Sequence, residues 1–234
     1  LFERYVARIV PIPTGVDPAK VTTALVVTET GATRHVPTDV YRDTDGLWYA
    51  RISSVTNSVY ALVSNDAGFA DASGKWYEAA VTEMAERMIL NGRSSDSFDG
   101  GSSITRAEFA ALIVRALGLP ENGVSDFSDL SAADWYYGAV GTAYTYKIIS
   151  GRGGGIFDPN AAITREEALA MIARAARVAE FDSTAAGGTA GFTDLGKVSA
   201  WALASVEFNL ANGLIKGAGG LIREPIVQLE VVEL

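Results

Sequence analysis

A repeated helix-start motif constrains this chain more than any other feature of its sequence. Residues 104–108 read ITRAE, residues 163–167 read ITREE, and the surrounding residues recur in register. Thr-x-x-Glu before an apolar run is a capping box: the Thr hydroxyl accepts a hydrogen bond from the Glu amide, and the Glu carboxylate accepts one from the Thr amide. The sequence therefore predicts two helices that begin at capping boxes, formed by Thr105 with Glu108 and by Thr164 with Glu167.

Apolar residues follow each box at helical spacing. They stand at i, i+3, i+4 and i+7, the pattern of an amphipathic helix with one buried stripe. The matching sets are Phe109, Leu112, Ile113 and Ala116 after the first box, and Ala168, Met171, Ile172 and Ala175 after the second.

The residue inside each box that capping does not explain is an arginine. Arg106 and Arg165 occupy the first helical position, where a cation opposes the positive end of the helix dipole. An anion bound there would accept hydrogen bonds from both the guanidinium and the free helix amides. Solvation, or pairing with a neighbouring acid, is the alternative. Its recurrence in the same slot favours an anion site at each arginine.

The motif belongs to a larger unit that occurs three times. Each unit opens with Phe-x-Asp and continues with a Trp and a Gly, which predicts a helix beginning near the Trp and ending at the Gly in a left-handed conformation. The openings are Phe69, Phe127 and Phe192, with Asp71, Asp129 and Asp194 expected at helix starts; the Trp residues are Trp76, Trp135 and Trp201, and the Gly residues Gly92, Gly151 and Gly217.

Each first helix is expected to turn one apolar column toward the core, and the following loop is expected to bury Phe98 or Phe157. Units of this size cannot bury a face alone, so the three should pack on one another. The columns are Val81, Ala85 and Ile89, then Val140, Tyr144 and Ile148, then Val206, Leu210 and Leu214.

The third unit departs from this pattern. Arg223 stands where Phe is expected, and residues 229–233 read LEVVE where the helix-start motif should be. The motif arginine is lost, which argues against a third anion site. Residues 226–234 are expected to be extended.

Residues 1–66 have a strand-like pattern instead. Residues 21–28, 35–40, 47–52 and 58–63 are rich in β-branched and apolar residues, with turn signals at 29–32 and at Asp45-Gly46. We therefore predict an α+β chain, with a small antiparallel β module at 1–66 and three helix-loop-helix repeats in 67–234, at 69–118, 127–177 and 192–234.

Composition excludes several classes of function. The formal charge of −9 argues against nucleic-acid binding, and no apolar run has membrane-spanning length. The chain has no Cys and one His, His35, so thiolate chemistry, a His-based triad and a histidine metal site have little to draw on. A working carboxylate pair stays open, but we expect no catalysis, cofactor or metal. We also expect this sequence, which starts at Leu1, to be part of a longer protein.

These motifs together resemble the S-layer homology domain triplet of Gram-positive bacterial surface proteins. The resemblance covers residues 69–234 and is partial in the third unit, while the β module is similar to one that precedes such triplets in Paenibacillus-type proteins. It implies a pseudo-threefold α bundle at the cell surface, with grooves that bind pyruvylated secondary cell wall polysaccharide. Arg106 and Arg165 would then meet the ketal carboxylate of a terminal N-acetylmannosamine. Glu108 and Glu167 would hold the loops.

Two further features join this expectation. Trp135 and Trp201 would offer faces to a sugar ring, while Trp76 is expected in the core. The loop Ser150-Gly151-Arg152-Gly153 adds charge and closely approaching amides, although such loops also merely turn the chain.

The alternative function is self-assembly into a surface lattice without glycan. We base it on three tyrosines expected to be exposed: Tyr136, Tyr137 and Tyr146.

Overall fold

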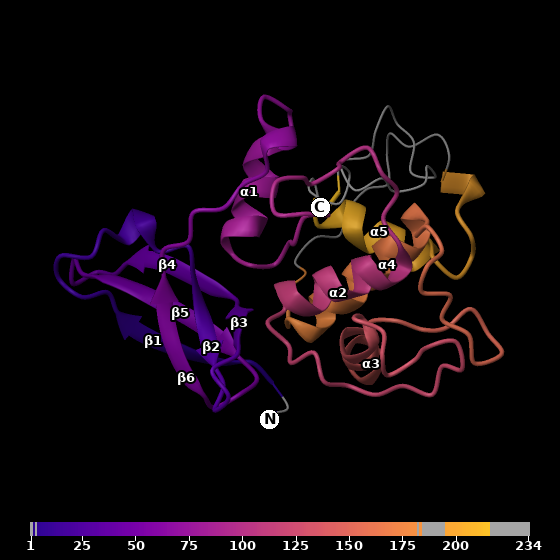
Figure 1. Cartoon of the computed structure of the whole chain (residues 1–234), viewed down its shortest axis with the longest axis horizontal. Coiled ribbons are helices and arrows are strands. Elements are labelled where there is room, and N and C mark those ends of the chain that lie inside the picture. Colours follow the sequence, from indigo (N-terminus) through magenta and orange to yellow (C-terminus); the bar gives the residue numbers. More distant parts are fainter. Residues whose placement is uncertain (1, 3, 182, 184–194, 216–234) are drawn as a thin grey trace. The chain divides into compact units, whose positions relative to one another are not determined.

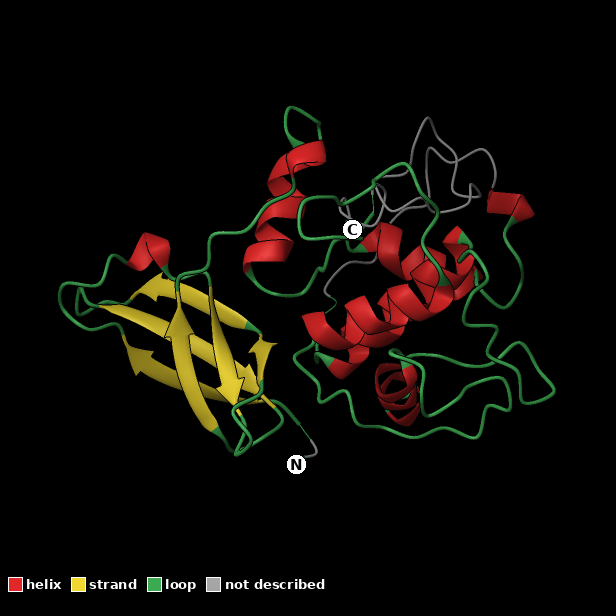
Figure 2. Ribbon diagram, in the orientation of Figure 1, coloured by secondary structure: helices red, strands yellow, loops and turns green. Residues whose placement is uncertain are grey.

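The computed structural model of the 234-residue chain describes residues 2, 4–181, 183 and 195–215 (Figure 1). Helices and antiparallel strands are both present, which confirms the α+β class (Figure 2). The chain forms two compact units, Leu1–Asp99 with Val114–Pro120, and Gly100–Ile113 with Glu121–Leu234. No helix in the described residues is long and apolar enough to cross a membrane.

The first unit contains two antiparallel three-stranded sheets, as the β-branched runs predict. One has the order β1-β5-β4 and the other β3-β2-β6. The strands are β1 (Val6–Pro11), β2 (Thr23–Val27), β3 (Thr33–Val36), β4 (Thr38–Arg42), β5 (Trp48–Ser54) and β6 (Val59–Val63), with a short 3-10 helix, η1, at Pro18–Lys20.

The chain passes from one sheet to the other at Pro37. Proline has no amide hydrogen to donate to a ladder, so β3 ends before it and β4 begins after it. Its carbonyl still accepts a hydrogen bond from the Ser53 amide at 2.9 Å. Strands of both sheets contribute to one apolar cluster, formed by Ala24, Val26, Val36 and Ile52.

The predicted helices are present where the residues are described. α1 (Glu78–Glu86), α3 (Tyr137–Thr145) and α5 (Leu203–Ala211) each begin two residues after a Trp, and α2 (Arg106–Ala116) and α4 (Arg165–Val178) begin at the motif arginine. Short 3-10 helices, η2 (Ala70–Ala72) and η3 (Leu195–Lys197), precede two of the Trp residues.

Both capping boxes are confirmed. The Thr105 amide donates to Glu108 at 2.7 Å and the Glu108 amide to Thr105 Oγ1 at 3.2 Å. The corresponding distances between Thr164 and Glu167 are 3.0 and 3.2 Å.

The helix ends differ from the prediction. The left-handed residues that end α1 and α3 are Met88 (φ 59°) and Lys147 (φ 57°), four residues before Gly92 and Gly151. The Lys147 amide bonds the Tyr144 carbonyl and the next amide bonds that of Ala143, a Schellman motif. Gly151 serves a different purpose, since a Cβ there would lie 2.7 Å from Phe127 Cε1 and 2.6 Å from the Ile156 carbonyl oxygen.

Burial also differs in part. The single-stripe prediction for the second helices is wrong, because α4 also buries Leu169, Ala170 and Ala173 outside that stripe. Trp76, expected in the core, is 60% exposed, and Tyr144 is 40% exposed. Phe98 and Phe157 are fully buried, as predicted.

Asp71 and Asp129 do not start helices. The Asp129 carboxylate accepts hydrogen bonds from the amides of Phe157 and Asp158 at 2.9 and 2.6 Å, and Asp71 holds the amides of Phe98 and Asp99 in the same way, both at 2.8 Å. These hydrogen bonds fix the loop that carries the buried phenylalanine.

Several predictions fall outside the described residues: those for Phe192, Asp194, Gly217, Arg223 and residues 226–234. The divergent third unit, the pseudo-threefold arrangement and the limits of the repeats therefore stay predictions.

Candidate functional site

A groove of about 440 Å³ lies in the second compact unit. Its walls come from the first residue of α2, the loop after α3, one face of α4 and the Trp before α5. The lining residues are Arg106, Ser150, Gly151, Arg152, Glu167, Ala170, Met171, Arg174 and Trp201.

One face of α4 forms much of the groove wall. Glu167, Ala170, Met171 and Arg174 stand at i, i+3, i+4 and i+7, so they follow one another along the same side of the helix. The capping box fixes the first of them, because the Glu167 carboxylate accepts the Thr164 amide.

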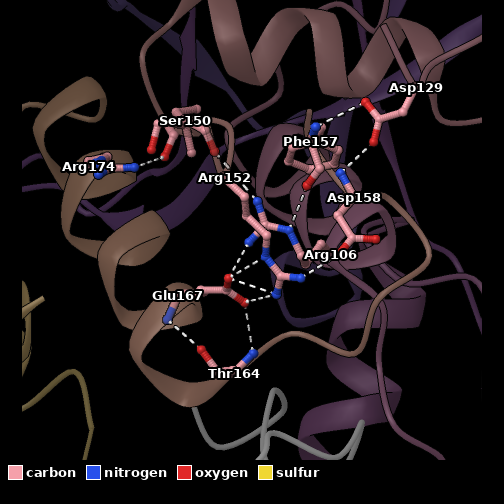
Figure 3. A network of polar contacts seen from close by, with 10 residues as sticks. Arg106, Asp129, Ser150, Arg152, Phe157, Asp158, Thr164, Glu167 and Arg174 are labelled. Carbon is pink, nitrogen blue, oxygen red and sulfur yellow. Dashed lines mark hydrogen bonds and ion pairs between the residues drawn. The ribbon is translucent and has the colours of Figure 1, made fainter. Parts of the chain in front are cut away.

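Arg106 is deeply buried beside this face, with 2% of its surface exposed. Its Nη1 lies 2.8 Å from Glu167 Oε1, and its Nε donates to the Phe157 carbonyl at 2.9 Å (Figure 3). The guanidinium also lies over the Phe157 ring, 4.8 Å from the centroid. Arg106 is thus paired with an acid of the next repeat, the alternative that the sequence left open.

Arg152 approaches the same carboxylate from the loop. Its Nε and Nη2 donate to Glu167 Oε1 at 3.0 and 2.9 Å, and its Nη1 pairs with Asp158 (Figure 3). One carboxylate therefore holds two guanidiniums and a backbone amide.

The electrostatics of Glu167 follow from these contacts. Burial alone would raise the pKa of its carboxyl group, but the Thr164 amide and the guanidiniums of Arg106 and Arg152 outweigh burial and lower the pKa. Glu167 is therefore ionised at neutral pH, and it keeps the two arginines in fixed positions.

The sequence reasoning missed Arg174. Its Nη1 donates to the Ile148 carbonyl at 3.2 Å, and no carboxylate in the described part of the chain pairs with it (Figure 3). Burial, and then the nearby Arg177, lower its pKa, although a guanidinium stays charged. The available signal was an arginine recurring in the same slot of both second helices, at 115 and 174.

The glycine loop turns the chain as well as lining the groove. Gly153, Gly154 and Gly155 all have positive φ, the Arg152 amide donates to the Ile156 carbonyl at 2.8 Å, and the Ile156 amide donates to that of Gly153 at 3.1 Å. The Arg152 amide is thus used within the loop. Gly153 lines a separate, more open concavity of about 630 Å³ with Phe127 and Tyr144.

The structure gathers only part of the predicted site. Arg106, Ser150, Gly151, Arg152, Glu167 and Trp201 meet at the groove, and Trp201 is 58% exposed there. Arg165 is 8% exposed and does not line it. Trp135 is 60% exposed and packs edge-on against Tyr136 instead, and Thr105 and Glu108 serve the start of α2.

Comparison with known proteins gives a family. Residues 68–110 and 126–169 match the family model of the S-layer homology domain. The chain is 33% identical over 162 residues to an amylopullulanase of Thermoanaerobacterium thermosulfurigenes, covering 68% of this chain and 9% of that protein.

Surface proteins are also among its relatives. Identity is 32% to a surface-layer 125 kDa protein of Lysinibacillus sphaericus, over 59% of this chain and 11% of that protein. It is 31% to a surface layer protein of Brevibacillus choshinensis, over 52% of this chain and 11% of that protein. The chain thus spans about a tenth of the length of these relatives. It belongs to the S-layer homology family, whose place is the cell wall at the bacterial surface.

Proposed function

We propose that this chain anchors a surface protein to the cell wall by binding the secondary cell wall polysaccharide non-catalytically, through a terminal N-acetylmannosamine that bears a pyruvate ketal. The groove beside Arg106 is the proposed site. The observation that carries the proposal is its charge: in a chain of net charge −9, the guanidiniums of Arg106, Arg152 and Arg174 meet there against the carboxylates of Glu167 and Asp158.

The groove also suits a sugar ring. Trp201 exposes more than half of its surface at the wall, and sugar C–H groups pack well on an aromatic face. Ser150 adds polar atoms, and a volume of about 440 Å³ lies within the range of small-ligand sites. We propose equivalent roles for Arg165 and Trp135, which hold the corresponding slots of their repeats.

Calorimetric titration tests this function. Wild-type protein should bind pyruvylated N-acetylmannosamine and should bind the sugar without the ketal more weakly. Trp201→Ala should weaken binding of both sugars about tenfold, whereas Trp48→Ala, which removes a 41% exposed tryptophan of the β module, should leave affinity unchanged. Absence of binding to either sugar would refute the proposal.

Assembly into a lattice remains the second candidate, on a different observation from the one expected. Tyr136 is buried and Tyr137 and Tyr146 are half-buried, so they offer little contact surface. The β module instead exposes Ile9 by 60% and Val59 by 69%. Concentration-dependent light scattering without glycan, abolished by Ile9→Ser, would favour assembly.

A further inference from the structure

We infer that Arg174 makes the direct contact with the carboxylate of the ligand, and that Arg106 is a positioning residue that acts through Glu167. This inference rests on the proposed function and assigns its anion subsite. It departs from the expectation that the motif arginine meets the anion itself.

The contacts of Arg106 leave little for a ligand. Its guanidinium is 2% exposed, pairs with Glu167 and donates to the Phe157 carbonyl. A ligand carboxylate could bind there only by displacing Glu167. Glu167 is covalently held at the site by its helix and is also bound by the Thr164 amide, so the exchange would lose interactions without adding a charge pair.

Arg152 is occupied in the same way. Both edges of its guanidinium are used, one by Glu167 and the other by Asp158. With two carboxylates already in contact, its charge is compensated, and a third carboxylate would meet repulsion from them.

Arg174 is different from both. A guanidinium has five N–H donors, and the contact that the structure gives Arg174 is one hydrogen bond to the neutral Ile148 carbonyl. Arg177 lies close enough to add positive potential, and in the described residues no acid compensates it. A partly buried, uncompensated cation on a groove wall gains strongly from an arriving anion.

The position of Arg174 also fits a ligand that combines a sugar ring with a carboxylate. It lies two turns after Glu167 on the same face of α4, with Met171 between them, and Trp201 lines the same groove. Because Glu167 and its two arginines close one end of this face, the anion is directed toward the other end.

The experiment compares Arg174→Gln, Arg174→Lys and Arg106→Gln with wild type, using the ketal sugar and the ketal-free sugar in calorimetric titrations. Arg177→Gln is the matched control, since Arg177 is an exposed arginine one turn further along α4 that does not line the groove. Thermal unfolding of each variant reports its folding.

Arg174→Gln should weaken binding of the ketal sugar by about 10-fold to 100-fold, with unchanged affinity for the ketal-free sugar and an unchanged unfolding midpoint. Arg174→Lys should restore part of the preference, and Arg177→Gln should behave as wild type. Arg106→Gln should lower the unfolding midpoint and weaken binding of both sugars alike.

Two results would overturn the inference, and they are distinguishable. If wild type prefers the ketal sugar and Arg174→Gln keeps that preference, the anion lies elsewhere in the groove and only the assignment fails. If wild type binds neither sugar, the proposed function fails and the assignment with it.

Discussion

Glu167 Oε1 lies 2.8 Å from Nη1 of Arg106, so the carboxylate that caps α4 also neutralises the first residue of α2 in the preceding repeat. The Glu of one helix-start motif thus serves the Arg of another. Since Arg106 is almost fully buried, one repeat depends on the next to satisfy its motif charge. This contact links the stability of the second unit to the shape of its groove.

Glu167→Gln should therefore destabilise the protein strongly. The change keeps the size of the side chain and one capping hydrogen bond, but it leaves the Arg106 guanidinium buried without its counter-charge. Breaking a buried pair by removing one partner costs about 3–5 kcal/mol, which urea unfolding would measure. Glu83→Gln is the control: its salt bridge with Arg87 is on the surface, Glu83 is 64% exposed, and such pairs contribute about 0–1 kcal/mol.

Adding Arg106→Met to Glu167→Gln should recover part of the lost stability, because no buried charge then remains unpaired. A Glu167→Gln variant as stable as Glu83→Gln would contradict the buried-pair interpretation.

Asp129→Asn should loosen the loop that carries Phe157. The uncharged side chain is a weaker acceptor for the amides of Phe157 and Asp158, and charge-assisted hydrogen bonds contribute about 1.5–3 kcal/mol each. Hydrogen exchange of these two amides should speed up and the unfolding free energy should fall. Asp126→Asn, which alters an exposed carboxylate of the same segment, should change neither. Unchanged protection of the two amides would refute the clamp.

The left-handed helix ends give a paired prediction. Lys147→Gly should stabilise the protein by up to about 1 kcal/mol, because a side chain at φ 57° is strained and glycine is not. Gly213→Ala, at φ 65° in the corresponding slot after α5, should destabilise it by about 1–2 kcal/mol, since a Cβ there meets no atom within 4 Å and only the backbone strain acts. Thermal unfolding should move in opposite directions. Equal signs would contradict this account.

His35 should make the stability of the first unit depend on pH. It is 4% exposed, with Nδ1 2.7 Å from Thr23 Oγ1. Burial, and then the charge of Arg87, lower its pKa from 6.5 to about 4. The unfolded chain therefore takes up the proton first, so this stability is fully present above pH 6.5 and is lost as the pH falls toward 4, by up to roughly 3 kcal/mol.

NMR titration can follow this group directly, because the chain has one histidine. We expect a midpoint near pH 4, and one near 6.5 would be contrary to the buried state. His35→Gln should have a weaker loss of stability between pH 7 and 5 than wild type. The difference between the two proteins removes the contribution of carboxylates such as Glu167, which also lose stability as the pH falls.

The sequence by itself determined the helices, the antiparallel β module and the family. Capping boxes at Thr105 and Thr164, period-3.6 apolar residues and β-branched runs act over a few residues, so the chain encodes them locally. Buried phenylalanines at 98 and 157 followed from the register of the repeat.

Only the tertiary structure decided which charges meet. Arg106 pairs with an acid of the next repeat, Asp129 holds amides in a distant loop, and Arg174 reaches the groove without a carboxylate partner in the described residues. The position of the helix ends was decided in the same way, since close packing of Gly151 against Phe127 mimics the sequence signal of a helix stop. A charged side chain takes the partner that packing brings within reach, and sequence spacing does not contain that distance.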